Sequence, residues 1–251
     1  EYSVWAERAG QALDRSHWDA DRGAYVDSVD TRTGEASRQI SQQGNALMIH
    51  FGIAPQERWE AIVKRITDAG RLKLTAVPPV VMGGEDLDPE HDVVLANTFF
   101  SHYVFSALAD AGRFDLAISQ MRTFYEPMLD AGATTLWESY HPGASLCHAA
   151  SATAVYQLSA HALGVRPGTP GCGEIIIAPQ PGDLQWAKGI YPTVSGPVAV
   201  FWQHARGEMV LEIEVPPGIQ ARVVAPPGRR AVTDPGMLAP GRHRIRFQTH
   251  A

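Results

Sequence analysis

The residue types that can do chemistry are most concentrated between Gly132 and His148. Glu138 lies in this segment, directly after Trp137 and two positions before Tyr140. A carboxylate flanked by aromatic rings suits sugar recognition, because the rings offer apolar faces to the C–H side of a pyranose and the carboxylate can act as a general base. The alternative is that Glu138 caps the following helix or forms an ion pair at the surface. His148 likewise has two interpretations: it contacts a ligand, or it is a histidine whose hydrogen bonds are satisfied inside the core.

A second group of ionisable side chains lies just before a predicted helix that starts near Asn97 or Thr98. It contains Glu85, Asp86, Asp88, Glu90, His91 and Asp92. Such a group suits a cation site or a second catalytic carboxylate, but its spacing does not fit the twelve-residue EF-hand loop. The alternative, which we favour, is a solvated acidic loop. No phosphate-binding glycine motif and no nucleophile elbow is present, and we predict neither a metal nor a cofactor.

The elements that must position these residues are predicted to be helices as far as about residue 165. Between Pro55 and Ile66 the apolar residues recur at i, i+3, i+4 and i+7, which indicates one buried helix face with proline in the first turn. The same spacing predicts helices over about 98–111 and 114–128, and Gly112 between them makes the pair an αα-hairpin. Further helices are expected near residues 3–14, 39–52 and 147–163.

The last third of the chain has a different pattern. Residues 165–171 are rich in proline and glycine and resemble a linker. Residues 209–215 and 243–247 then alternate apolar and charged side chains, which is typical of half-buried strands, and Pro-Gly pairs separate such segments. Several short strands of this kind predict an antiparallel β-sandwich. We therefore predict two domains, a helical-hairpin domain over residues 1–166 and a β-sandwich domain over residues 167–251.

Composition narrows the classes of partner. A net charge of −6 argues against a nucleic-acid-binding protein, for which a basic surface is expected. The sequence has no apolar run of the roughly 18 residues that a membrane span needs, so we expect no membrane segment. The two cysteines, Cys147 and Cys172, form neither a metal-ligand spacing nor a disulfide framework.

Several segments together resemble the glycoside hydrolase family that includes the bacterial α-L-rhamnosidases. The most specific are the Thr-Thr-Leu-Trp-Glu element ending at Glu138, the downstream His148, and Gly-Val-Arg-Pro at 164–167. The resemblance extends to the segments 109–113, 145–149, 176–179 and 184–196, and it runs from about residue 15 to about residue 225. Each segment alone is a weak signal, and their order along the chain makes the combination specific.

This resemblance implies a mainly α fold with a C-terminal β part: an (α/α)6 barrel of six helical hairpins followed by a β-sandwich. It also implies inverting hydrolysis of small-molecule or oligosaccharide α-L-rhamnosides, with Glu138 as general base. His148 matches a histidine that contacts the sugar, and Trp137 and Tyr140 are the other residues that we expect to bind substrate. An inverting mechanism needs a second carboxyl group, the general acid, roughly 6.5–9.5 Å from the base.

The family's general acid lies in the first half of its barrel, and we find no counterpart in this chain. About six predicted helices are also only half of a twelve-helix barrel, so we expect the N-terminal half of the barrel to be missing here. A half barrel exposes apolar helix faces, which promote association; we therefore predict that this chain self-associates or needs its missing half. Two other functions stay open: a non-catalytic carbohydrate-binding fragment, and another six-hairpin exo-glycosidase such as an unsaturated glucuronyl hydrolase.

Overall fold

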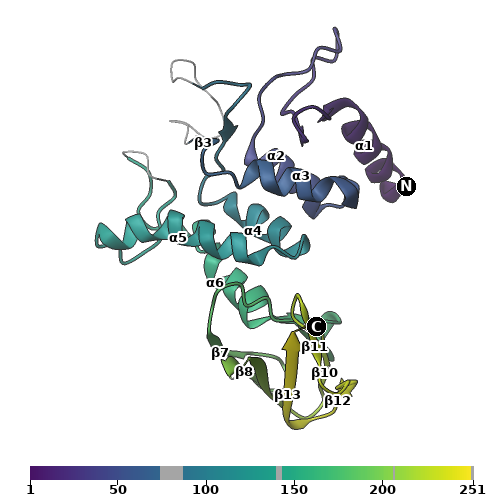
Figure 1. The fold of residues 1–251 in the computed structure, drawn as a ribbon, viewed down its shortest axis with the longest axis vertical. Coiled ribbons are helices and arrows are strands. Elements are labelled where there is room, and N and C mark those ends of the chain that lie inside the picture. Colours follow the sequence, from purple (N-terminus) through teal and green to yellow (C-terminus); the bar gives the residue numbers. More distant parts are fainter. Residues whose placement is uncertain (74–86, 140–142, 206, 250–251) are drawn as a thin grey trace. The chain divides into compact units, whose positions relative to one another are not determined.

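A computed structural model of the chain describes residues 1–73, 87–139, 143–205 and 207–249 (Figure 1). The chain forms two compact units. The first, mostly helical, contains residues 1–111 and 119–153, and the second, mostly β, contains residues 112–118 and 154–251. The domain boundary that we place at residue 166 from the sequence stays a prediction.

The helices of the chain follow the predicted order in its first 130 residues. They are α1 (Tyr2–His17), α2 (Gln42–His50), α3 (Gln56–Ile66), α4 (Ser101–Asp110) and α5 (Phe114–Asp130), and later α6 (Thr153–Gln157). The predicted helix over 147–163 is broken: a 3-10 turn, η1 (Ala149–Ser151), precedes α6, and a π-helix, η2 (Leu158–Leu163), follows it. In this region the buried hydroxyls of Ser151 and Thr153 bond to side chains of other segments, which a regular amphipathic helix would not require.

Burial of one apolar face explains the central helices. The side chains of Ile62, Val63 and Ile66 are buried on α3, as the apolar spacing predicts. In α4, seven of the ten residues are buried, and this helix packs on α2. The link to α5 turns at Gly112, whose φ of +69° favours glycine. The two helices and the short turn between them are therefore as predicted.

Two buried amide side chains on α2 hold the extended segments around it. Asn45 accepts a hydrogen bond from the backbone N–H of Tyr25 at 2.8 Å and donates to its carbonyl at 2.9 Å. Gln42 donates to the carbonyl of Ile66 at 2.8 Å and accepts from the N–H of Ala96 at 3.1 Å. Both side chains are fully buried, so these bonds replace the water that the amides lose on folding.

Short strands complete the first unit. The strands β1 (Trp18–Asp19) and β2 (Ala24–Tyr25) form an antiparallel pair. The strands β3 (Leu72–Lys73) and β4 (Val93–Val94) pair in parallel. Ala24, Ile40 and Val93 form a small buried cluster where these segments meet, with Leu72 packed against it.

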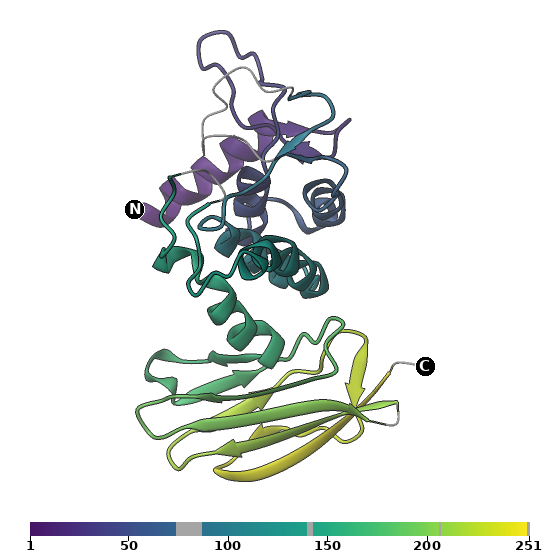
Figure 2. The same cartoon turned by 90° about the vertical axis from the view of Figure 1, so that its left-hand side faces the viewer.

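The β unit contains two sheets (Figure 2). Its elements are β5 (Val165–Pro167), the 3-10 turn η3 (Pro170–Cys172), β6 (Glu174–Ile177), β7 (Trp186–Tyr191), β8 (Val198–Ala205), β9 (Glu208–Val215), β10 (Gln220–Val223), β11 (Arg229–Ala231), β12 (Met237–Leu238) and β13 (Gly241–Thr249). The strand orders are β11-β13-β9-β8-β7 and β12-β10-β6-β5. All pairs are antiparallel, as predicted, except β6 with β10, which is parallel. The stretch that resembles a linker begins as β5, because Val165 is buried in this unit.

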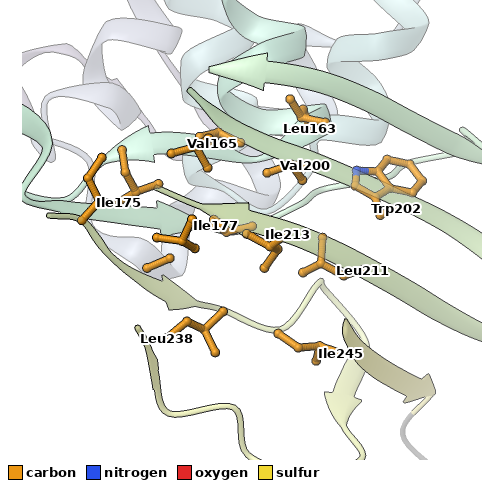
Figure 3. Close-up of a cluster of buried hydrophobic side chains, with 14 of the residues drawn as sticks. Leu163, Val165, Ile175, Ile177, Val200, Trp202, Leu211, Ile213, Leu238 and Ile245 are labelled. Carbon is orange, nitrogen blue, oxygen red and sulfur yellow. The ribbon is translucent and has the colours of Figure 1, made fainter. Parts of the chain in front are cut away.

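The core of the β unit lies between its two sheets (Figure 3). Ile175 and Ile177 enter it from β6, and Trp202 and Leu211 enter it from β8 and β9. The indole N–H of Trp202 donates to the carbonyl of Ala162 at 2.9 Å, so the one polar atom of this buried ring is satisfied. The two sheets sharing one apolar core make this unit a sandwich.

The first helix presents an uncovered apolar surface. None of the sixteen residues of α1 is buried. Tyr2, Val4 and Trp5 are each more than half exposed. The predicted self-association, which depends on such faces, stays a prediction. Among the described residues, no helix is both long and apolar enough to cross a membrane.

Candidate active site

Glu138 lies in the connection between α5 and η1, and this connection folds back on itself. The backbone N–H of Glu138 donates to the carbonyl of Ser145 at 2.9 Å. The N–H of His148 donates to the carbonyl of Leu136, also at 2.9 Å. The loop therefore has two paired arms, in which Glu138 lies opposite Ser145 and His148 lies opposite Leu136.

A buried pair of hydroxyl groups holds both arms. Thr98 Oγ1 lies 2.9 Å from Ser151 Oγ, and the two residues are 2% and 0% exposed. Thr98 donates to the carbonyl oxygen of Trp137 at 2.9 Å and also contacts that of Glu138. On the other side, Ser151 Oγ lies 3.1 Å from Nδ1 of His148. One hydrogen-bonded chain thus connects the backbone at Glu138 with the ring of His148.

The hydroxyl protons available in this series of hydrogen bonds determine the tautomer of His148. Thr98 has one hydroxyl proton, and a carbonyl oxygen can only accept it. Thr98 must then accept from the hydroxyl of Ser151, and Ser151 must in turn accept from Nδ1–H of His148. In its neutral form His148 therefore carries its proton on Nδ1, and Nε2 is left as a hydrogen-bond acceptor.

The hydrogen-bonded series is held in place by residues from three elements that lie far apart in the sequence. Thr98 precedes α4, Ser151 ends η1, and Tyr125 of α5 donates its hydroxyl proton to the backbone carbonyl of Ser151 at 2.8 Å. Sequence reasoning missed all three residues. In the sequence these residues appear as polar positions within otherwise apolar helical segments. Such a pattern does not show which of the polar residues contact one another.

The side chain of Glu138 is exposed, and Trp137 and His148 are half-buried. Oε2 of Glu138 accepts a hydrogen bond from the backbone N–H of Ser145 at 3.1 Å. Among the described residues Glu138 forms neither an ion pair nor a helix cap, and the residue at the N-cap of η1 is His148. Tyr140 lies outside the described residues, so its predicted place beside Glu138 stays a prediction.

A row of aromatic rings continues from His148. The ring of Phe99 lies 6.4 Å from that of His148 in an edge-on arrangement. The ring centroid of Phe100 lies 6.5 Å from that of Phe99 and 5.1 Å from that of Tyr103. The ring of Phe51 lies 6.4 Å from that of Tyr103. Phe99 and Phe51 are 45% and 63% exposed. Exposed rings in such a row offer the apolar faces that a pyranose needs.

Two further histidines lie beside this row. Nδ1 of His102 is 2.8 Å from the hydroxyl of Thr153, and Nδ1 of His50 is 2.8 Å from the carboxylate of Asp110. Burial lowers the pKa of His102, and the nearby His50 lowers it further. His102 is therefore neutral at pH 7, and it is a polar but uncharged part of the surface around the row.

In the described part of the acidic segment before α4, Asp92 and Glu90 interact with side chains of the protein itself. Asp92 is buried and lies 2.8 Å from Nδ1 of His91. Glu90 forms an ion pair with Arg38. Residues 85–86 lie outside the described part of the chain. Among the described residues, no group of three or more histidine, cysteine or acidic side chains is arranged to hold a metal ion.

Comparison with known proteins identifies relatives for both units. Residues 164–236 match the bacterial alpha-L-rhamnosidase C-terminal domain. An alpha-L-rhamnosidase of Streptomyces avermitilis is 32% identical over 135 residues, which cover 47% of this chain and 13% of that protein. The solved structure of a GH78 family rhamnosidase of Bacillus sp. GL1 matches 90% of this chain with a TM-score of 0.72 and 30% identity.

A second solved structure, Streptomyces avermitilis alpha-L-rhamnosidase complexed with L-rhamnose, shares the fold over 90% of this chain with a TM-score of 0.62 and 22% identity. This chain spans 23% of the length of each of these two solved chains. The matches reach the helical unit as well as the β unit. The chain is therefore similar to α-L-rhamnosidases in both units, and its residues 164–236 match that family's C-terminal domain.

Proposed function

We propose that this chain is part of an inverting glycoside hydrolase that releases terminal α-L-rhamnose from rhamnosides. Its relatives are α-L-rhamnosidases, and one of them is known in complex with L-rhamnose. The observation that carries the proposal is the exposed carboxylate of Glu138, held on a loop that buried hydroxyls fix to the helices. In this proposal the helices of the first unit are half of an (α/α)6 barrel, and the general acid lies outside this chain.

Glu138 acts as the general base. The N–H of Ser145 fixes Oε2 at 3.1 Å, so the carboxylate has a defined orientation while Oε1 remains available to a water molecule. The carboxylate takes a proton from that water as the water attacks the anomeric carbon opposite the leaving group. A positioned general base of this kind contributes about 10²–10⁴-fold to the rate.

His148, Trp137 and Tyr140 bind the sugar. With its Nδ1 proton donated to Ser151, the neutral form of His148 has Nε2 as an acceptor for a sugar hydroxyl. Phe99 beside it and the half-buried ring of Trp137 supply apolar surface for the C–H face of rhamnose. This division of work agrees with the usual make-up of a ligand site, in which a few polar groups fix the orientation within an apolar surface.

A carbohydrate-binding fragment without catalysis is the second candidate. One observation favours it for the isolated chain: the chain spans 23% of its solved relatives, and no counterpart of the family's general acid is found in it. Without an acid to protonate the leaving group, the site would bind a rhamnoside and not hydrolyse it.

The test is release of p-nitrophenol from a panel of aryl glycosides, measured for this chain alone and for the full product of its gene. We expect the full product to hydrolyse the α-L-rhamnoside and this chain to bind it without turnover. Hydrolysis by this chain alone would contradict the placement of the general acid. Hydrolysis of another glycoside by the full product, with none of the rhamnoside, would replace the proposal by a different exo-glycosidase.

A further inference from the structure

The β unit contains a pocket of about 360 Å³ that the proposed hydrolytic site does not use. Its walls are the first residues of α5 with Phe114, the loop 180–182, His204 near the end of β8, Pro227 in the turn before β11, and Arg229 at the start of β11. All of these residues belong to the same compact unit.

One wall of the pocket depends on a close approach of backbone to backbone. Gly182 has a φ of +54°, and a Cβ at this position would lie 2.9 Å from Ile118 Cδ1 and 3.2 Å from Asp115 Cα. Only glycine fits there without displacing α5. The packing of the loop on the helix therefore fixes this wall of the pocket.

The charged groups of the pocket do not cancel. Arg113 pairs with both carboxylate oxygens of Asp115, at 3.0 and 2.9 Å, and this pair is neutral. Arg229 forms no ion pair with any described carboxylate. Its Nη2 lies 3.4 Å from Nδ1 of His204, and its Nη1 is shielded from solvent without a hydrogen-bond partner among the described residues. One positive charge thus remains at the pocket.

His204 is neutral at pH 7, because burial lowers its pKa and the charge of Arg229 lowers it further. Its Nδ1 is then the acceptor of the contact with Arg229, and Nε2–H is left as a donor. The pocket therefore combines a guanidinium and an imidazole donor with apolar surface from Phe114 and Pro181.

We propose that this pocket binds a small polyhydroxylated carboxylate, of which a hexuronic acid is the simplest example. A guanidinium matches the geometry of a carboxylate, and one uncompensated positive charge matches one negative charge. The volume lies within the range of about 300–1,000 Å³ that is usual for small-molecule sites, and is larger than an isolated carboxylate needs. The proposal does not depend on Glu138 or on hydrolysis.

The test is calorimetric titration of the whole chain with D-glucuronate, D-glucose and inorganic phosphate. We expect D-glucuronate to bind about tenfold or more tightly than either of the others, because D-glucose lacks the charge and phosphate lacks the hydroxylated ring. Equal binding of D-glucose would overturn the proposed charge recognition. Equal binding of phosphate would make the pocket a general oxyanion site and overturn the sugar-acid assignment. No binding of D-glucuronate at millimolar concentrations would overturn the proposal altogether.

Two variants of β11 localise the site. Arg229→Gln should weaken D-glucuronate binding by about tenfold or more, because it removes the charge and the fork of donors. Arg230→Gln changes the net charge equally on the exposed face of the same strand and should alter binding less than about twofold. Equal losses in the two variants would place the ligand elsewhere. If circular dichroism shows Arg229→Gln to be misfolded, Arg229→Lys replaces it, and undiminished binding by that variant would contradict recognition by the planar fork.

Discussion

Thr98→Val should destabilise the helical unit although valine has nearly the shape of threonine. The substitution removes the hydroxyl that donates to the loop carbonyls at Trp137 and Glu138 and that accepts from Ser151. Thr98 is 2% exposed, so water does not replace these bonds. Leaving a buried polar group without a partner costs about 1–3 kcal/mol. We expect a loss of about 2 kcal/mol in the free energy of unfolding. The loss stays below the upper end of this range because the hydroxyl of Ser151 can redirect its own proton.

Urea unfolding followed by the helical circular-dichroism signal measures this loss. The matched control is Thr123→Val, because Thr123 is exposed on α5 and its hydroxyl makes a local bond to the carbonyl of Ser119. We expect the control to change stability by less than about 0.5 kcal/mol. Combining Thr98→Val with Ser151→Ala should give a coupling energy of about 1 kcal/mol. Equal effects of the two valine substitutions, or strict additivity of Thr98 and Ser151, would refute the proposed hydroxyl chain.

Three further predictions concern stability. Asn45→Ala should cost about 3 kcal/mol in urea unfolding, because the buried amide makes three hydrogen bonds to backbone groups; a loss below about 1 kcal/mol would contradict this role. Gly164→Ala should lower the midpoint of thermal unfolding more than Gly228→Ala does. Both glycines have positive φ, but a Cβ at Gly164 would lie 2.4 Å from a backbone nitrogen, whereas the space at Gly228 is open. Equal losses would show that only φ matters. The lowered pKa of His102 means that the unfolded chain takes up a proton that the folded chain resists, so stability should fall as the pH drops below about 6.5. His102→Gln should flatten this pH dependence, and an unchanged slope would assign it to other groups.

Local patterns in the sequence predict the elements that carry their own periodicity. The spacing of Ile62, Val63 and Ile66 predicts α3, and the alternation in residues 209–215 predicts β9, because one buried face determines each pattern. Gly112 predicts the turn between α4 and α5 because few other residues adopt its conformation.

Features that depend on partners distant in the sequence could not be predicted in this way. The parallel pairing of β6 with β10 depends on how the two sheets assemble, and a strand's own residues do not specify it. Val165 belongs to a strand because the core of the β unit covers it, although its neighbours resemble a linker. At the candidate site, Glu138 and His148 stand out by their type and setting. The hydroxyl chain through Thr98 and Ser151 joins residues 53 positions apart, and no local pattern records it.

The proposed role of Glu138 is tested most directly by the turnover number of Glu138→Gln for p-nitrophenyl α-L-rhamnoside, in the full product of the gene. Glu126→Gln, the same change at an exposed position of α5, is the control. We expect Glu138→Gln to lower kcat by about 10²–10⁴-fold, while its unfolding curve and the kcat of the control stay close to those of the unaltered protein. Near-normal turnover in Glu138→Gln would contradict the assignment of Glu138 as the general base.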